Sequence, residues 1–254
     1  MSRVPAYADL VAEHGSGAFF ELANAAAFTY DGLTLEQRNR LDDSCAGIVW
    51  ESAFALIAYL RRSESFARLA RRGGTALELG SGCGLLGLCA AKEFGFARVT
   101  LTDTSSAVED VLRANAERNA SVLGGRARVM TLDWEREDEL EAVVREDGPF
   151  DCVFGTDVIF SERLVGALVR CVERALRRRK RSVCYICVQR RSPEAHDEFL
   201  RLAHERFDVK KIPREEFSFT EDDECEIFEL RWRARDVQAS SAAKSRDRKR
   251  RKIE

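Results

Sequence analysis

The amino-acid sequence predicts an α/β fold, with a sheet of seven strands that is mostly parallel, an antiparallel strand pair at its C-terminal end, and helices on both faces. Two observations predict this class. From about Thr75 onward, short apolar segments of β type alternate with helical segments, which is typical of parallel sheets covered on both sides. A glycine-rich stretch then lies at the first strand-to-helix junction, where such sheets bind ligands.

Five strand-like segments form the repeating part of this pattern. They occupy residues 75–79, 98–102, 126–130, 150–156 and 182–188. The segments between and after them have the spacing of amphipathic helices, as in residues 106–120, where Val108, Val111 and Leu112 share one face. The other predicted helices occupy residues 85–95, 139–146, 164–179 and 193–207.

Two more strand-like segments close the pattern, at residues 207–212 and 224–232. Only the loop 213–223 separates them, and it contains no predicted helix. Two strands without a crossover helix between them can pair antiparallel. The sequence therefore predicts seven strands, of which the last two form an antiparallel pair.

The chain divides into three predicted regions. Residues 1–47 form an N-terminal extension, in which the segments 8–15 and 33–43 are polar or helical in pattern. Residues 48–235 form the main domain, which begins with an apolar helical segment suited to packing on the sheet. Residues 236–254 lack apolar periodicity and are rich in Ser, Ala and charge, so we expect a disordered basic tail.

Charge and hydropathy limit the classes of function. The formal net charge is −2, but the end of the chain from Lys244 is strongly basic, so the main domain gives no indication of nucleic-acid binding. No apolar segment is long enough to cross a membrane, and the N-terminus does not resemble a secretory signal. We expect a cytoplasmic monomer. The basic segment 248–252 is either a nuclear-import signal or a solubilising terminus.

The sequence contains eight cysteines. In a reducing compartment disulfides are rare, and a free cysteine within an apolar pattern packs as a small hydrophobic residue. The pair Cys184 and Cys187 has the CxxC spacing of redox and zinc sites, but it lies in a predicted strand, where residues three apart point to opposite faces. With only three histidines and no second CxxC, we expect no metal site.

The glycine loop is the first candidate binding site. Gly80, Gly82 and Gly84 follow the end of the first predicted strand at Leu79. Glycine permits positive φ and removes the Cβ atoms that would obstruct a ligand. A tight turn without a ligand is the alternative, but three alternate glycines at a strand-to-helix junction favour a ligand loop.

The same loop also contains the dinucleotide spacing GxGxxG, at Gly82, Gly84 and Gly87. The dinucleotide fingerprint begins where the first strand ends, so in that register its third glycine would be residue 85. Residue 85 is leucine. The glycine that allows close packing of helix on strand in dinucleotide folds is therefore missing from this register, which disfavours a nicotinamide cofactor.

Two further sites follow the next strands. Asp103 ends the second strand, where a carboxylate can accept hydrogen bonds from both ribose hydroxyls or can cap the following helix. Asp133 and Trp134 follow the third strand. There the carboxylate can accept a hydrogen bond from an adenine amino group and the indole can pack on the ring, unless the tryptophan is simply part of the core.

The motifs LELGSGCGLLGL, TD at Asp103, LDW at Asp133 and FGTDVIFSERL together resemble those of the Rossmann-like, seven-strand methyltransferases that use S-adenosylmethionine. More narrowly, VWESAFALIAYL, TDVIF and VQRRSPEAHDEFLRLAHERFDVKKI resemble the family-16 protein-lysine methyltransferases. Members of that family modify chaperones, AAA ATPases and elongation factors. The resemblance covers residues 48–232, and it implies S-adenosylmethionine as cofactor and a protein as substrate.

The resemblance also implies roles for single residues. Trp50 would cover the methionine end of the cofactor, Asp103 would bind the ribose, and Asp157 would face the methyl group and the incoming side chain. Phe160 stands where many relatives have tyrosine, so the hydroxyl found in those relatives is missing here. The remaining cofactor-binding residues implied by the resemblance are Glu78, Gly80, Gly82, Gly84, Asp133, Trp134 and Thr156.

The implied reaction makes chemical demands on this site. A lysine is mostly protonated at neutral pH, and an apolar channel beside the positive cofactor would favour its neutral form. Asp157 could orient the amine and Phe160 could pack against it. The alternatives are a helix cap for Asp157 and a core position for Phe160.

Other functions stay open on the sequence alone. The acceptor is alternatively a small molecule, or an arginine or histidine of a protein, and a non-catalytic scaffold of the same fold is a different class of alternative. Gln189, Arg190 and Arg191 end the fifth strand on the same edge. They either bind acidic groups of a protein substrate or form a solvated charged loop.

Overall fold

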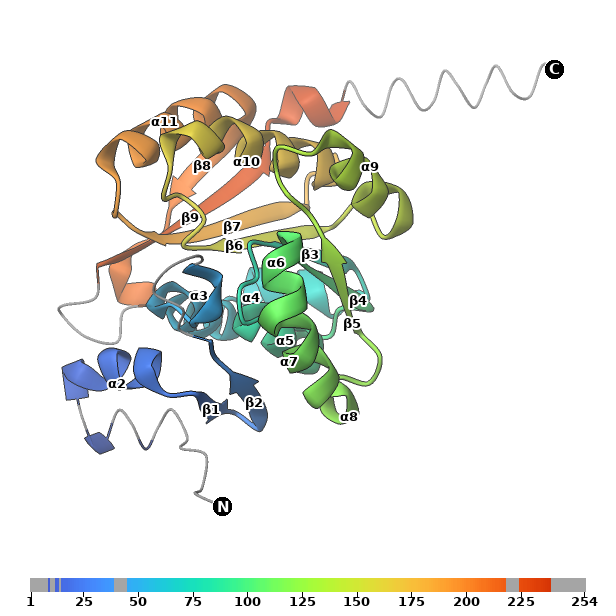
Figure 1. The fold of residues 1–254 in the computed structure, drawn as a ribbon. Coiled ribbons are helices and arrows are strands. Elements are labelled where there is room, and N and C mark those ends of the chain that lie inside the picture. Colours follow the sequence, from blue (N-terminus) through green and yellow to red (C-terminus); the bar gives the residue numbers. More distant parts are fainter. Residues whose placement is uncertain (1–8, 10–11, 14, 39–44, 218–223, 239–254) are drawn as a thin grey trace.

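A sheet of seven strands forms the centre of the molecule (Figure 1). In this computed structural model, residues 9, 12–13, 15–38, 45–217 and 224–238 are described. The strand order is β5-β4-β3-β6-β7-β9-β8. The bounds are β3 Thr75–Leu79, β4 Arg98–Asp103, β5 Ala127–Thr131, β6 Cys152–Thr156, β7 Val183–Gln189, β8 Phe207–Lys211 and β9 Cys225–Trp232.

The directions of the strands confirm the predicted fold class. Strands β3 to β7 pair parallel with one another, whereas β9 pairs antiparallel with both β7 and β8. Strand β9, the last in the described part of the chain, is therefore inserted between β7 and β8. The strand order reverses beside β3, which continues to β4 on one side and lies against β6 on the other, and ligands bind at such a point in open α/β sheets.

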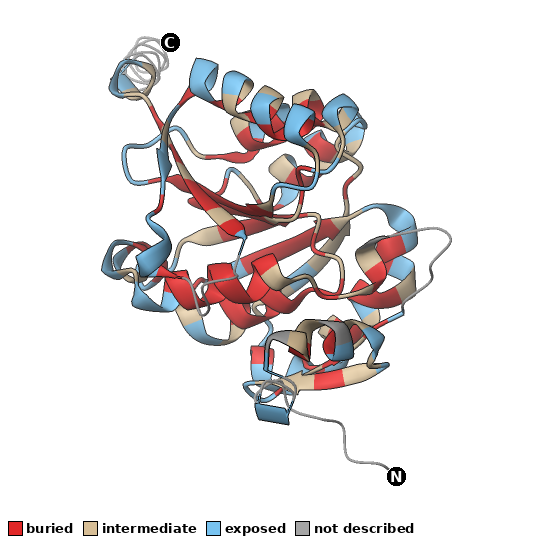
Figure 2. Ribbon diagram, turned by 90° about the vertical axis from the view of Figure 1, so that its left-hand side faces the viewer, coloured by how far each residue is buried: buried red, intermediate tan, exposed pale blue. Residues whose placement is uncertain are grey.

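Helices cover both faces of the sheet (Figure 2). One face packs on α3 (Glu51–Arg62), α4 (Glu64–Ala70), α5 (Leu85–Cys89) and the segments from α6 (Ser105–Ala107) to α8 (Ala120–Leu123). The other face packs on α9 (Glu137–Glu146), α10 (Glu162–Ala175) and α11 (Pro193–Arg206). The π-helical turns η3 (Ala90–Phe94) and η4 (Val108–Leu112) continue α5 and α6, and α7 (Arg113–Arg118) follows η4. Three short 3₁₀ turns complete the elements: η1 (Gly15–Gly17), η2 (Cys45–Gly47) and η5 (Arg214–Glu216).

A small hairpin precedes α3, and here the sequence interpretation was wrong. After α2 (Ala18–Asn24), the strands β1 (Ala27–Tyr30) and β2 (Leu33–Glu36) pair antiparallel, although the segment 33–43 was interpreted as polar or helical. Leu33 and Leu35 are fully buried and alternate with half-buried polar residues, which is the period of a strand. Four residues are too short a window for that period to be evident against the polar residues that follow.

Two asparagines of the main domain form hydrogen bonds with this hairpin. The side chain of Asn119 accepts a hydrogen bond from the Thr34 amide (2.9 Å) and donates one to the Thr34 carbonyl (2.8 Å). Asn115 does the same for Glu36, at 2.8 and 3.0 Å. Both asparagines are buried, and they satisfy backbone groups on β2 that no strand pairs. The hairpin therefore belongs to the same folded unit as the sheet.

The cysteines pack as the sequence predicts. Seven are free and buried in the described part of the chain, and Cys184 and Cys187 belong to the cores on opposite faces of the sheet. Burial raises the pKa of the Cys83 thiol to about 12. No group of three potential ligand side chains that could hold a metal ion is found in the residues described above. No described helix is long and apolar enough to span a membrane.

The predicted disordered tail, residues 236–254, lies mostly outside the described residues. Its first part continues a helical segment at 234–238. The basic segment 248–252 lies among the residues that are not described.

Candidate active site

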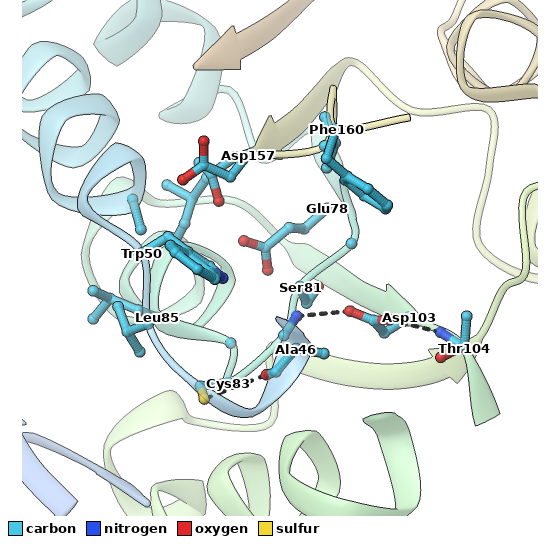
Figure 3. A pocket seen from close by; sticks show the side chains of 18 of the residues that line it. Ala46, Trp50, Glu78, Ser81, Cys83, Leu85, Asp103, Thr104, Asp157 and Phe160 are labelled. Atoms are coloured by element: carbon cyan, nitrogen blue, oxygen red, sulfur yellow. Dashed lines mark hydrogen bonds between the residues drawn. The ribbon is translucent and has the colours of Figure 1, made fainter. Parts of the chain in front are cut away.

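A cavity opens at the carboxyl ends of β3, β4 and β6, and the start of α3 forms one of its walls (Figure 3). It encloses about 1060 Å³ of empty space, its open mouth included, which is the size of a small-molecule site. All the residues that the family resemblance assigns to the cofactor or the acceptor line it: Trp50, Glu78, Gly80, Gly82, Gly84, Asp103, Asp133, Trp134, Thr156, Asp157 and Phe160. Segments that are far apart in the sequence therefore meet at one place.

The glycine loop forms the floor of the cavity. Gly80, Gly82 and Gly84 all have positive φ, at 65°, 52° and 88°, a conformation that other residues adopt only with strain. Space is short as well, because a Cβ atom on Gly82 would lie 3.1 Å from the Ala46 carbonyl oxygen. The intervening Ser81 ties the loop to β4, since its amide donates to the Thr102 carbonyl at 2.9 Å. The backbone conformation of the loop, and not its side chains, therefore shapes the floor of the cavity.

The helix after the glycine loop packs closely on the sheet at Gly87, which the sequence did not predict. In the dinucleotide register, the glycine that allows close packing of helix on strand would be residue 85, which is leucine. The structure has it two residues later, where a Cβ atom on Gly87 would lie 2.6 Å from Cγ of Leu101 and would overlap the Glu78 carboxylate. The absence of a glycine at residue 85 therefore does not mean that the helix packs loosely.

Glu78 is an acidic side chain with almost no exposure to solvent. It is 1% exposed, and the Gly87 amide donates to its Oε2 at 3.1 Å. Burial raises the pKa of Glu78 to about 8, although hydrogen bonds from Ser81 and Gly87 oppose the rise. Near neutral pH burial therefore favours the protonated form of this carboxyl group.

Asp103 lies at the end of β4 and is held by two backbone amides. Its Oδ2 accepts from Gly82 at 2.8 Å, and its Oδ1 accepts from Thr104 at 2.8 Å. Burial raises the pKa of its carboxyl group, against the effect of these bonds. The helix-cap alternative is wrong, because α6 begins at Ser105 with Thr104 as the preceding residue and no side-chain cap.

Asp133 and Trp134 form the wall beyond β5. Oδ1 of Asp133 accepts from the Glu135 amide at 3.0 Å, and the Asp133 amide donates to Glu139 at 2.7 Å. The Trp134 ring is half-buried and faces Phe160, with 6.4 Å between the ring centroids. Phe160 is 52% exposed, so the alternative of a core position for this residue is wrong.

Asp157 follows β6 in an unusual backbone conformation. Its φ is 52°, a region in which residues other than glycine are uncommon and are often functional. Its carboxylate is 6% exposed; Oδ1 accepts from the Gln189 amide at 3.1 Å, and Oδ2 lies 3.4 Å from Nη2 of Arg191. It does not cap α10, which starts after Ser161. The backbone therefore turns this carboxylate away from the helix and toward the end of β7.

Arg191 connects the two sides of the cavity mouth. Its guanidinium lies 4.3 Å from the centroid of the Trp50 ring, a cation–π distance, and it donates to the Gln189 side chain at 2.6 Å. The Gln189 amide group in turn donates to Glu51 at 2.5 Å. Arg190 forms an ion pair with Asp197 at 2.9 Å. Both arginines are exposed, in agreement with a solvated charged loop, but each guanidinium has an acidic partner in the fold.

The sequence analysis missed Glu51 and the stacking of Arg191 on Trp50. Glu51 is adjacent to a named residue, which was the only available signal. The contact with Arg191 joins segments that are distant in the chain, and only the strand order brings them together.

The comparisons with known proteins bear on this site directly. A family model described as lysine methyltransferase matches residues 29–206. The chain belongs to this lysine methyltransferase family. The match starts inside the β1–β2 hairpin, in agreement with its packing against the main domain. The cofactor of this lysine methyltransferase is S-adenosylmethionine.

Individual relatives agree with the family. Protein N-lysine methyltransferase METTL21A of Mus musculus is 31% identical over 189 residues, which are 74% of this chain and 80% of that protein. EEF1A lysine methyltransferase 3 of Mus musculus is 33% identical over 117 residues, 46% of this chain and 45% of that protein. Magnesium protoporphyrin IX methyltransferase from Synechocystis, solved with bound SAM, has a TM-score of 0.51 at 15% identity, covering 71% of this chain and 80% of that one. That likeness concerns the fold.

Proposed function

We propose that this lysine methyltransferase acts on a protein substrate, with the cofactor lying on the glycine loop and the acceptor lysine entering beside Asp157. The observation that carries the proposal is that one cavity joins the loop at Gly82 and the carboxylate of Asp103 to the carboxylate of Asp157. A ligand that spans this cavity has both ends in contact with a carboxylate.

Each part of the cavity fits one part of S-adenosylmethionine. Gly80, Gly82 and Gly84 leave room for the methionine portion, with Glu78 beneath it and Trp50 above it. Asp103 accepts from the ribose hydroxyls, because each of its oxygens uses only one lone pair for a backbone amide. Asp133 and Trp134 receive the adenine, the first through its amino group and the second through its ring. Thr156 lines the cavity next to Asp157.

The bound cofactor supplies an activated methyl group on its sulfonium. What the protein must do is align the lysine nitrogen with that carbon and accept the side chain in its neutral form. Asp157 orients the amine by accepting a hydrogen bond from it, and Phe160, half-exposed at the mouth, packs against the aliphatic part of the lysine. Because Phe160 has no hydroxyl, Asp157 is the polar group that fixes the amine.

Arg191 and Gln189 are positioning residues in this account. The carboxylate of Asp157 is held by both, and the same guanidinium holds the Trp50 ring. The positive charge of Arg191 beside Asp157 also reduces the attraction of that carboxylate for an ammonium group, which favours the neutral amine. The two groups therefore guide the lysine without keeping it protonated.

A labelling experiment identifies the acceptor. The purified protein is incubated with a cell lysate and S-adenosylmethionine carrying an isotopically labelled methyl group, and the products are analysed by mass spectrometry. We expect label on lysine residues of one or a few proteins. Label that appears only on small metabolites, or only on arginine or histidine, contradicts the proposal. The family resemblance makes a protein of the elongation-factor, chaperone or AAA ATPase type the expected substrate, and the name of the relative EEF1A lysine methyltransferase 3 is in line with the first of these.

We also propose that the protein works as a monomer in the cytoplasm and reaches the nucleus through the basic segment 248–252. The net charge of that segment supports an import signal. Removing residues 239–254 tests it, because the shortened protein is then expected to stay out of the nucleus while its methyltransferase activity is unchanged.

A further inference from the structure

A second hollow lies at the opposite end of the sheet from the cavity already described. It is bounded by α4 and the turn after it, by the start of β7 and by the end of β9. Strand β7 connects the two places, since Val183 at its start lines the second hollow and Gln189 at its end contacts Asp157 and Arg191. Seven residues of strand separate them by roughly 20 Å. The second hollow is therefore a separate site.

Arginine dominates its lining. Arg68, Arg72, Arg181 and Arg231 come from three different parts of the chain, and no Asp or Glu lines the hollow. The remaining lining is mostly apolar, with Phe66 and Tyr185 almost completely buried. Like charges around one hollow repel one another wherever no carboxylate pairs them, and a bound anion offsets that repulsion.

The four guanidinium groups differ in how far they are neutralised. Arg231 is paired with Glu229 at 2.6 Å, and Arg68 with Glu64 at 3.1 Å, where Glu64 is 87% exposed. Arg72 and Arg181 are exposed and form no ion pair within the described part of the chain. The neighbouring Arg179 and Lys180, in the loop before β7, are also exposed and form no ion pair with a described residue. Two unpaired guanidinium groups thus face one hollow, in a protein whose overall net charge is negative.

We propose that this hollow binds a small phosphate-bearing anion of the di- or triphosphate type. Guanidinium groups bind phosphate through paired hydrogen bonds, and several cations around one hollow favour a ligand with several charges. A nucleic acid fits less well, because the aromatic rings here are buried and offer no surface on which bases stack. The proposal does not depend on the methyltransferase function.

Calorimetric titration of the full-length protein with pyrophosphate tests the proposal. Three proteins are compared: the wild type, the double variant Arg72→Gln/Arg181→Gln, and the control Arg113→Gln. Arg113 is an exposed arginine on α7, outside the hollow. We expect pyrophosphate to bind the wild type and the control with similar affinity. Inorganic phosphate should bind both proteins more weakly than pyrophosphate does. The double variant should lose about tenfold or more in affinity.

A second arm repeats the titration with the protein saturated by S-adenosylhomocysteine. Binding of pyrophosphate should be unchanged, because the two hollows are separate. The thermal midpoint of each variant without ligand establishes that it is folded. The proposal is overturned if the wild type does not bind pyrophosphate, if the double variant binds it as well as the wild type does, if S-adenosylhomocysteine displaces it, or if a DNA duplex binds better at equal phosphate concentration.

Discussion

At the scale of single residues, the cofactor end of the site depends on backbone shape more than on side chains. Gly82 combines a positive φ with a close approach to Ala46, and its amide is one of the two groups that hold Asp103. A side chain at this position strains the loop, moves Ala46 and disturbs the carboxylate proposed to bind the ribose. Glycine there is required by the geometry of the loop.

Replacing Gly82 with alanine should therefore weaken the binding of S-adenosylhomocysteine by about tenfold or more, as measured by calorimetry. Gly125→Ala is the matched control. Gly125 also has a positive φ, 71°, but a Cβ atom there would meet nothing within 4 Å. Both variants carry backbone strain, and only the first should lose affinity. Equal affinities would show that the loop does not contact the cofactor.

Glu78 makes the stability of the free protein dependent on pH. Its pKa is raised from 4.5 in the unfolded chain to about 8 in the fold by burial. Between these values the folded protein keeps a proton that the unfolded chain has released, so stability falls as the pH rises. Glu78→Gln should remove this fall, because glutamine is neutral throughout and its oxygen can still accept from Gly87.

Chemical unfolding of both proteins at pH 5 and pH 8, without cofactor, measures this difference. The wild type should lose more stability than Glu78→Gln between the two pH values. If both lose the same amount, Glu78 is not the group responsible.

At the scale of elements, the hairpin β1–β2 links the N-terminal region to the cofactor side of the molecule. Asn115 and Asn119 bind the backbone of β2, and Asn115 also donates to the carbonyl of Cys83 in the glycine loop at 3.0 Å. The hairpin and the loop therefore share one buried side chain. Helix α3 begins at Glu51, directly after Trp50, and follows the hairpin in sequence.

Asn119→Ala should destabilise the protein by about 1–3 kcal/mol, because it leaves backbone groups of Thr34 without their partners. Urea unfolding measures the change. Glu117→Ala, an exposed change on α7, should alter stability by less than about 0.5 kcal/mol. A comparable loss in both variants would mean that the hairpin is not held by Asn119.

At the scale of the whole molecule, periodicity predicted the sheet because β3, β4, β6 and β7 are mostly buried and lie between helices of clear pattern. The seven strands begin and end within two residues of their predicted bounds. Sequence patterns do not give the order of strands, so the insertion of β9 between β7 and β8 became known only from the structure. The hairpin was missed because its two strands are only four residues long.

The candidate site likewise has residues that the sequence predicts and contacts that it does not predict. Gly80, Gly82, Gly84, Asp103 and Asp157 follow directly after strands, and parallel strands bring their carboxyl ends to one edge of the sheet. Their place in the sequence was therefore enough to group them. Arg191 contacts Trp50, which is distant in the sequence, and no local pattern specifies such a contact. The alternatives of a helix cap for Asp157 and a core position for Phe160 likewise needed the three-dimensional structure.

The transfer rate of an Asp157 variant tests the central claim most directly. The protein lysine labelled in the lysate experiment serves as acceptor, and single-turnover methyl transfer is compared for the wild type, Asp157→Ala and the control Asp197→Ala, an exposed residue on α11. We predict that Asp157→Ala loses about 100-fold or more in rate while it still binds S-adenosylhomocysteine, and that the control keeps the wild-type rate. An Asp157→Ala variant that transfers methyl groups to lysine at the full rate would contradict the account.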